Sequence, residues 1–150
     1  KKLIFKKDKN YSKFFENYGY IINHQANLWT YDEIYFKKEG YKGINLCKKY
    51  IYYLNSLIKK ENAKLTIVVF PWPGQIYRDD YNIKQSSIWK KWSNENNISF
   101  IDLSGIFFKK SKRSESEKLK FIDTYFLNQD MHFNKNGHKM VADELKKYVN

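Results

Sequence analysis

The chain has 150 residues, enough for a single domain with a core but few for a complete α/β enzyme. Hydrophobic residues make up 42% and aromatic residues 19% of the sequence, a composition that excludes a disordered chain. The net charge is +12, but only Arg78 and Arg113 are arginine, so the side chain that makes bidentate contacts to phosphate and guanine is nearly absent. We expect solvated surface charge and no specific nucleic-acid partner; weak, salt-sensitive nucleic-acid binding is the alternative.

The first 40 residues carry only short signals. Lys1–Lys13 is basic, Tyr18–Ile22 is predicted to be a brief strand, and Thr30 or Asp32 is predicted to cap a following turn. From Gly43 onward the pattern is regular, because apolar residues recur every three or four positions and so fall on one helical face. That predicted face consists of Ile44, Cys47, Ile51, Leu54 and Ile58. Cys47 is therefore expected to be a small buried side chain.

Two short apolar runs indicate a parallel sheet. Leu65–Phe70 is rich in β-branched residues with little alternation, which is typical of a strand buried on both faces. Ile98–Asp102 is predicted to be a second strand, and Ile83–Asn97 between them a helix. The buried side of this helix is expected to hold Ile88, Trp89 and Trp92. A strand, helix and strand in this order predict two parallel strands with a right-handed crossover, and no apolar run is long enough to span a bilayer.

The C-terminal part alternates between charged and apolar segments. Lys109–Lys120 is charged and contains serines, which favours a solvated loop. Lys135–Tyr148 is predicted to form the last helix. Its inward side chains are expected to be Val141, Ala142, Leu145 and Tyr148.

The segment after the first strand is a candidate substrate site. Parallel sheets gather functional groups beyond the carboxyl ends of their strands, and Pro71–Gln75 follows Phe70 directly. Trp72 could stack on a sugar or acyl group, and Gln75 could form a hydrogen bond with it. The alternative is that the two prolines stiffen a turn and Trp72 packs over the sheet edge.

The segment Asp130–His138 is the strongest candidate for chemistry. A carboxylate two residues before a histidine can accept a hydrogen bond from one ring nitrogen and leave the other as a base. Asp130 and His132 have this spacing, and Asn134 can cap the following helix. A metal site built from Asp130, His132 and His138 is the less favoured alternative, since His138 is expected to lie within the helix and to pack or cap it. We expect no metal and no cofactor.

These residues resemble a known family. Asp130–His138, followed by Ala142, resembles the last sequence block of the SGNH/GDSL hydrolases, which include esterases, lipases and carbohydrate O-acetyl esterases. The likeness to a bacterial branch extends backward over roughly residues 28–150. It is carried by Trp29–Asp32, the helix near Gly43, Val69–Ile76 and Trp89.

The resemblance implies a three-layer α/β/α sandwich around a parallel sheet, of the flavodoxin-like type, with an incomplete N-terminal part. It implies that His132 is the base that deprotonates a serine, that Asp130 orients it, and that Asn134 and Gly137 support the loop. The family more often has its Asp one residue further from its His than in this chain. The family's Gly-Asp-Ser nucleophile block is absent, and its oxyanion donors cannot be assigned here.

We therefore expect the C-terminal part of a serine esterase that acts on an O-acylated carbohydrate or lipid. A noncatalytic, SGNH-like binding domain is the alternative. The 150 residues alone are expected to be inactive and marginally stable or prone to aggregation, because the missing strands would leave a sheet edge and apolar surface uncovered. Acyl group, acceptor and oligomeric state are left open. The compartment (cytoplasm or periplasm) is also left open, because the chain does not begin with Met and an N-terminal targeting signal is not observable.

Overall fold

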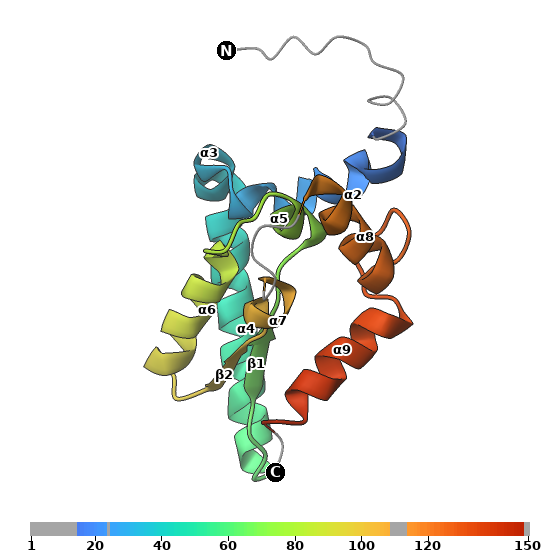
Figure 1. Cartoon of the computed structure of the whole chain (residues 1–150). Coiled ribbons are helices and arrows are strands. Elements are labelled where there is room, and N and C mark those ends of the chain that lie inside the picture. The colour runs from blue at the N-terminus through green and yellow to red at the C-terminus, as the bar shows by residue number, and fades with distance from the viewer. Residues whose placement is uncertain (1–14, 24, 109–113, 149–150) are drawn as a thin grey trace.

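We describe the chain from a computed structural model, which covers residues 15–23, 25–108 and 114–148. Helices surround a small parallel sheet, so the chain is a mixed α/β protein (Figure 1). The two described strands, β1 (Thr66–Val69) and β2 (Ser99–Asp102), pair in parallel from Thr66 opposite Ser99 to Val69 opposite Asp102. The predicted parallel pair is thus confirmed. Helix α6 (Lys84–Glu95), which joins the strands, lies against both of them.

The N-terminal described region is helical. Its elements are a π-helical turn η1 (Phe15–Gly19), α2 (Tyr20–Ile22), a 3-10 turn η2 (Gln25–Thr30), α3 (Glu33–Tyr35) and a second π-helical turn η3 (Phe36–Gly40). The strand predicted at Tyr18–Ile22 is therefore wrong. Ile21 and Ile22 are both buried although they are sequence neighbours, whereas successive side chains of a strand point to opposite faces.

Of the two predicted caps in this region, Asp32 is the one that caps a helix. Its Oδ1 accepts a hydrogen bond from the backbone N–H of Tyr35 at 2.8 Å, at the start of α3. The Thr30 hydroxyl instead donates to the backbone oxygen of Asn27 at 2.7 Å. The predicted basic segment Lys1–Lys13 lies outside the described residues.

Helix α4 (Tyr41–Lys60) is confirmed, but the face predicted to be buried is partly wrong. Its covered side chains are Ile44, Lys48, Ile51, Asn55 and Ile58, which are buried or half-buried. Cys47 and Leu54, both predicted to face the core, are exposed. Two apolar stripes run along this helix, and the one that contains Ile44, Ile51 and Ile58 packs against the protein. The covered face is therefore rotated away from Cys47 and Leu54.

The C-terminal half differs from its prediction in two places. Helix α8 (Glu115–Tyr125) occupies much of the stretch predicted to be a loop, while residues 109–113 lie outside the described residues. Its first turn is held by a capping box, in which Ser114 and Glu117 each accept a bond from the other's backbone N–H. Helix α9 (Lys135–Leu145) ends before Tyr148, and both Ala142 and Tyr148 are exposed, contrary to prediction. Val141 and Leu145 are half-buried and pack against the core, as predicted.

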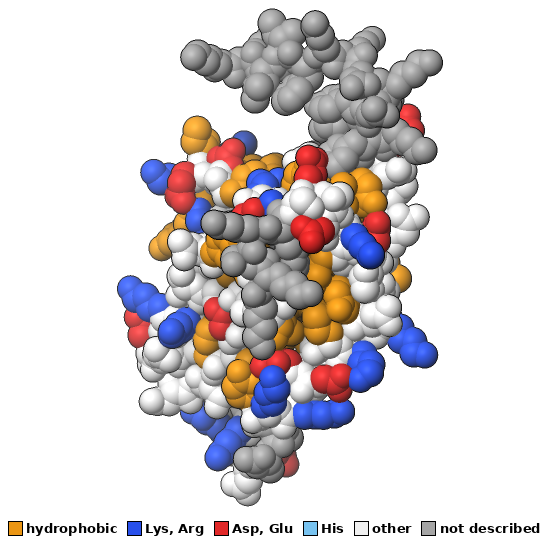
Figure 2. All heavy atoms as spheres, in the orientation of Figure 1, with side chains coloured by type: hydrophobic (Ala, Val, Ile, Leu, Met, Phe, Trp, Pro, Cys, Tyr) orange, Lys and Arg blue, Asp and Glu red, His pale blue; other side chains and the backbone are white. Residues whose placement is uncertain are grey.

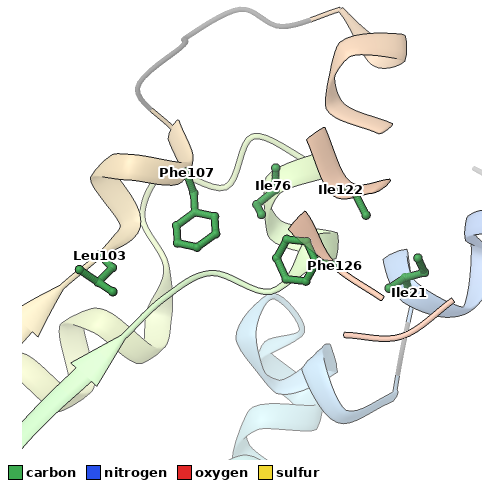
Figure 3. Close-up of a cluster of buried hydrophobic side chains, with 6 residues drawn as sticks. All are labelled: Ile21, Ile76, Leu103, Phe107, Ile122 and Phe126. Atoms are coloured by element: carbon green, nitrogen blue, oxygen red, sulfur yellow. The ribbon is translucent and has the colours of Figure 1, made fainter. Parts of the chain in front are cut away.

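The core joins segments that are far apart in the sequence. Its buried members are Ile21, Ile76, Leu103, Phe107, Ile122 and Phe126 (Figure 3). They come from α2, α5 (Pro73–Tyr77), the end of β2, α7 (Ser104–Phe108) and the end of α8. Phe107 is fully buried at the centre and contacts the rings of Phe121, Phe126 and Phe133.

Charged side chains cover the surface without one dominant sign on the face shown in Figure 2, where basic and acidic groups are interspersed. Two ion pairs link distant elements: Lys84 of α6 binds Glu33 of α3, and Lys118 of α8 binds Asp79 after α5. In the described part of the chain, no helix combines the length and the apolar character needed to cross a membrane.

Two tyrosines join helices to acidic partners and give stability a dependence on alkaline pH. The Tyr18 hydroxyl donates to Asp123 at 2.7 Å, and this bond is the main cause that raises the pKa of Tyr18 to about 12. Burial, followed by the bond to Glu115, raises the pKa of Tyr77 to about 12. A phenol whose pKa is higher in the folded state stabilises that state below its ordinary pKa, and this contribution is lost as pH rises further.

We predict that the free energy of unfolding falls as pH rises from 10 to 12, because over this range both phenols ionise in the unfolded chain but keep their protons in the folded one. Urea unfolding of the parent and of the double variant Tyr18→Phe/Tyr77→Phe measures the effect. The stability difference between the two proteins should shrink from pH 10 upward. A constant difference across this range would contradict the assignment, and lysine titration cancels in the comparison.

Candidate active site

The loop between α8 and α9 carries the predicted acid and base. It is closed by an antiparallel bridge between Phe126 and Phe133, and the backbone N–H of Leu127 donates to the oxygen of His132 at 2.9 Å. Inside the loop, Asp130 N donates to Leu127 O at 3.1 Å. The loop is therefore a short closed turn that fixes the backbone of both candidate residues.

Asn134 holds the two helices that flank this loop. Its Oδ1 accepts from the backbone N–H groups of Asn136 and Gly137 at 2.9 and 3.1 Å, so it is the N-cap of α9, as the sequence predicted. Its Nδ2 donates to the backbone oxygens of Thr124 and Phe126 at 3.0 and 2.9 Å. One amide thus satisfies free donors of α9 and free acceptors at the end of α8.

Gly137 and Phe133 complete this junction. A Cβ at Gly137 would overlap the backbone oxygen of Tyr125 and lie 2.8 Å from Cδ1 of Phe133, so only glycine allows the two helix ends to approach this closely. The ring of Phe133 stacks on Phe107 at 5.8 Å and contacts Phe70 at 4.7 Å. Because Phe70 follows β1, these ring contacts bring the loop to the carboxyl end of the sheet.

Asp130 and His132 form the predicted pair. The Oδ1 of Asp130 lies 2.6 Å from Nδ1 of His132 and also accepts from the His132 backbone N–H at 3.1 Å. An ionised carboxylate only accepts, so in the neutral imidazole Nδ1 carries the proton and Nε2 keeps a lone pair. The side-chain bond to His132 is the main cause that lowers the pKa of Asp130. The side chains are 44% exposed at Asp130 and 76% exposed at His132, so the base is open to solvent.

A cavity of about 350 Å³ lies beside this pair. It is mostly apolar, and its described lining consists of Phe70, Pro71, Trp72, Met131, His132, Phe133 and His138. The structure therefore brings Trp72 and His132, which the sequence singled out separately, to one cavity. Phe70 and Trp72 follow the last residue of β1, so the cavity lies at the carboxyl end of the sheet, where parallel folds bind ligands.

Gln75 lies away from the cavity. Its side chain is 0% exposed, and Oε1 accepts from the backbone N–H of Trp72 at 3.0 Å at the start of α5. It also pairs with the amide of Gln85, from which Oε1 accepts at 2.7 Å. In this conformation Gln75 is a structural residue that holds the turn after β1, and it is not accessible to a substrate.

Sequence reasoning singled out Trp72 and His132 but assigned no substrate contact to the other five described lining residues, which are Phe70, Pro71, Met131, Phe133 and His138. Their signal was adjacency, since all but His138 flank His132 or Trp72 in the sequence or follow the strand. His138 lies within α9, as predicted, and its ring is 5.8 Å from that of Phe133 in a T-shaped arrangement. Among the described residues, no three acidic, histidine or cysteine side chains come together as metal ligands.

The described lining of the cavity contains neither serine nor cysteine. The arrangement can therefore accept a proton at Nε2 of His132 and hold an apolar group beside it, but these residues do not supply a nucleophile. Comparisons with protein-family models, curated proteins and solved structures found no match to this chain.

Asn134→Asp tests the double role of this side chain. Aspartate caps a helix N-terminus as well as asparagine does, but it cannot donate to the two carbonyl oxygens of α8. We predict a loss of about 1–3 kcal/mol of unfolding free energy, measured by urea denaturation. The reverse exchange Asp32→Asn is the control, because that cap only accepts, and it should change stability by less than about 0.5 kcal/mol. Equal effects at both caps would contradict the donor role of Asn134.

His132→Ala tests the bond that lowers the pKa of Asp130. Without the imidazole the pKa of Asp130 should rise toward its ordinary value but not reach it, because the backbone N–H of residue 132 still donates to the carboxylate. The carboxyl ¹³C shift, followed by NMR during an acid titration, measures this change. Asp143 is the internal control, since bonds from Lys139 and Lys146 lower its pKa and do not involve His132. An unchanged Asp130 titration would refute the pairing.

Proposed function

We propose that this chain supplies the acid and base of a serine ester hydrolase of the SGNH/GDSL type, which acts on an O-acylated carbohydrate or lipid. In this proposal the two-stranded sheet is part of a larger parallel sheet inside a three-layer α/β/α sandwich. The observation that carries the proposal is the Asp130–His132 pair at the edge of an apolar cavity, next to the carboxyl end of β1.

The chemistry follows from the free nitrogen of His132. Nε2 would take the proton of a serine hydroxyl while the serine oxygen attacks the ester carbonyl carbon. The imidazolium that forms would be stabilised by Asp130, which already binds Nδ1. Return of the proton to the leaving alcohol would release it, and attack by water would then free the acid and restore the serine.

The cavity favours an acyl group as the part of the substrate that it holds. Its lining is mostly apolar, and Trp72 and Phe133 offer aromatic surface beside His132. A cavity of about 350 Å³ is at the lower end of the sizes common for small ligands. A short acyl chain would fit it, and the alcohol part would extend toward solvent on the exposed side of His132.

The serine would have to come from outside the described lining, because that lining offers no hydroxyl or thiol nucleophile. The same observation favours the second candidate, a noncatalytic binding domain. In that case the cavity would hold an acylated sugar or lipid, and the Asp130–His132 pair would serve only as a hydrogen-bonding edge.

The test uses the full-length protein that contains this chain, with p-nitrophenyl acetate as substrate. His132→Ala should lower kcat by about 10²–10⁴-fold, because general-base catalysis contributes this much. Asp130→Asn should also lower kcat, since the imidazole loses its orienting carboxylate. Asp143→Asn is the matched control: it removes a carboxylate whose pKa is also lowered, on the exposed side of α9, and should leave kcat unchanged.

The outcomes separate the two candidates. Labelling of one serine by a fluorophosphonate, abolished by His132→Ala, would support the hydrolase. Turnover that survives His132→Ala unchanged would refute the role of His132. Absence of turnover and of labelling, together with saturable binding of an acylated sugar or lipid that Trp72→Ala weakens, would support the binding domain instead.

A further inference from the structure

Helix α4 exposes a continuous apolar stripe. Leu46, Tyr50, Tyr53 and Leu57 are spaced by four, three and four residues, so they lie on one face of the helix. Their side chains are between 51% and 62% exposed. At 1.5 Å per residue the stripe is about 16 Å long. Single exposed apolar residues are ordinary, but a row of four on one helix face indicates a contact surface.

The stripe is separate from the core of the protein. The side of α4 that packs inward carries Ile44 and Asn55, which are buried, and the half-buried Ile51 and Ile58. The stripe lies on a different side, and Leu54, at 47% exposure, widens it. Toward the start of the helix, Cys47 borders an open groove of about 320 Å³ that Trp29 and Tyr35 also line. The apolar surface therefore continues beyond the helix itself.

The charge of α4 is of one sign. Within Tyr41–Lys60 the charged residues are Lys42, Lys48, Lys49, Lys59 and Lys60, and the helix contains no acidic residue. Lys42, Lys49 and Lys60 each lie three or four residues from a member of the stripe and so flank it. None of the five lysines forms an ion pair with a described residue. Glu39 precedes the helix, and Glu61, which follows it and is four residues from Leu57, borders the C-terminal end of the stripe, so three flanking lysines stand against one flanking acid.

This charge pattern decides between the possible occupants of the stripe. A second copy of the chain would bring two rows of lysines together, which opposes association. An apolar stripe of leucine and tyrosine with lysines at its edge is instead the pattern of a helix that lies in a membrane interface. Tyrosine suits this position, because its ring is apolar and its hydroxyl remains in water.

We propose that α4 binds the surface of an anionic phospholipid membrane. Leu46, Tyr50, Tyr53 and Leu57 enter the boundary between headgroups and acyl chains, while Lys42, Lys49 and Lys60 bind the anionic headgroups. The inference does not depend on the esterase proposal, because it concerns a different face of the protein and its test measures binding.

The test is cosedimentation of the full-length protein with vesicles of phosphatidylcholine, with and without about 30% phosphatidylserine. Binding should require phosphatidylserine and should weaken as sodium chloride rises from about 0.1 to 0.5 M. The triple variant Lys42→Gln/Lys49→Gln/Lys60→Gln should bind on the order of 100-fold more weakly, since each lysine near an anionic surface contributes about fivefold. Its control, Lys90→Gln/Lys120→Gln/Lys135→Gln, removes the same charge from exposed positions of α6, α8 and α9 and should have a much smaller effect.

The double variant Leu46→Asn/Leu57→Asn tests the apolar part. It should reduce vesicle binding at least tenfold, while Ile34→Asn/Tyr148→Asn, two exposed positions outside the stripe, should not. Circular dichroism and thermal melts verify that each variant folds like the parent.

Three results would overturn the proposal. The first is absence of binding to anionic vesicles. The second is vesicle binding that Leu46→Asn/Leu57→Asn does not reduce, which would indicate attraction to any polyanion, nucleic acid included. The third is a dimer in analytical ultracentrifugation that Leu46→Asn/Leu57→Asn dissociates, which would assign the stripe to a second copy of the chain.

Discussion

The side chain of Asn134 sets the geometry on which the candidate site depends. It accepts hydrogen bonds from two backbone N–H groups of α9 and donates hydrogen bonds to two backbone oxygens at the end of α8. It therefore fixes both helix termini relative to each other. Neither apolar packing nor a charged cap can perform both tasks, because the site needs a donor and an acceptor on one short side chain. The loop between these termini then has little freedom, and Phe133 anchors it against the aromatic core. This junction therefore fixes the positions of Asp130 and His132.

Much of the fold could be predicted because local pattern and tertiary structure agree. The β-branched run before Phe70 forms β1, and α6 joins it to a parallel β2 as expected. Predictions failed where one pattern allows two structures. Helix α4 carries two apolar stripes, and periodicity alone does not say which one packs inward. A short apolar run such as Tyr18–Ile22 does not separate helix from strand. At α8 the high charge obscured the Ser114–Glu117 capping signal, which was present in the sequence.

The candidate site divides in the same way. The Asp130–His132 bond and the Asn134 cap could be predicted, because they join residues within one loop and follow from spacing alone. Trp72 and His132 line one cavity because distant segments pack together, which local spacing does not predict. The only indication in the sequence was the general rule that parallel sheets bind ligands at the carboxyl ends of their strands. Gln75 shows the limit of this reasoning. Its position after the strand suggested a ligand contact, but its side-chain oxygen accepts hydrogen bonds from the backbone N–H of Trp72 and from the side-chain amide of Gln85.

The closeness of Asp130 and His132 in the chain has a consequence for how the protein tolerates change. Only Met131 lies between the two residues in the sequence, so bringing them together costs only the entropy of a very short loop. Loosening the core would move acid and base as one body and would leave their mutual alignment intact, whereas partners from distant segments would drift apart. The pair is therefore a local structural unit, and its mutual geometry should be retained if the loop is grafted onto another helix–loop–helix junction.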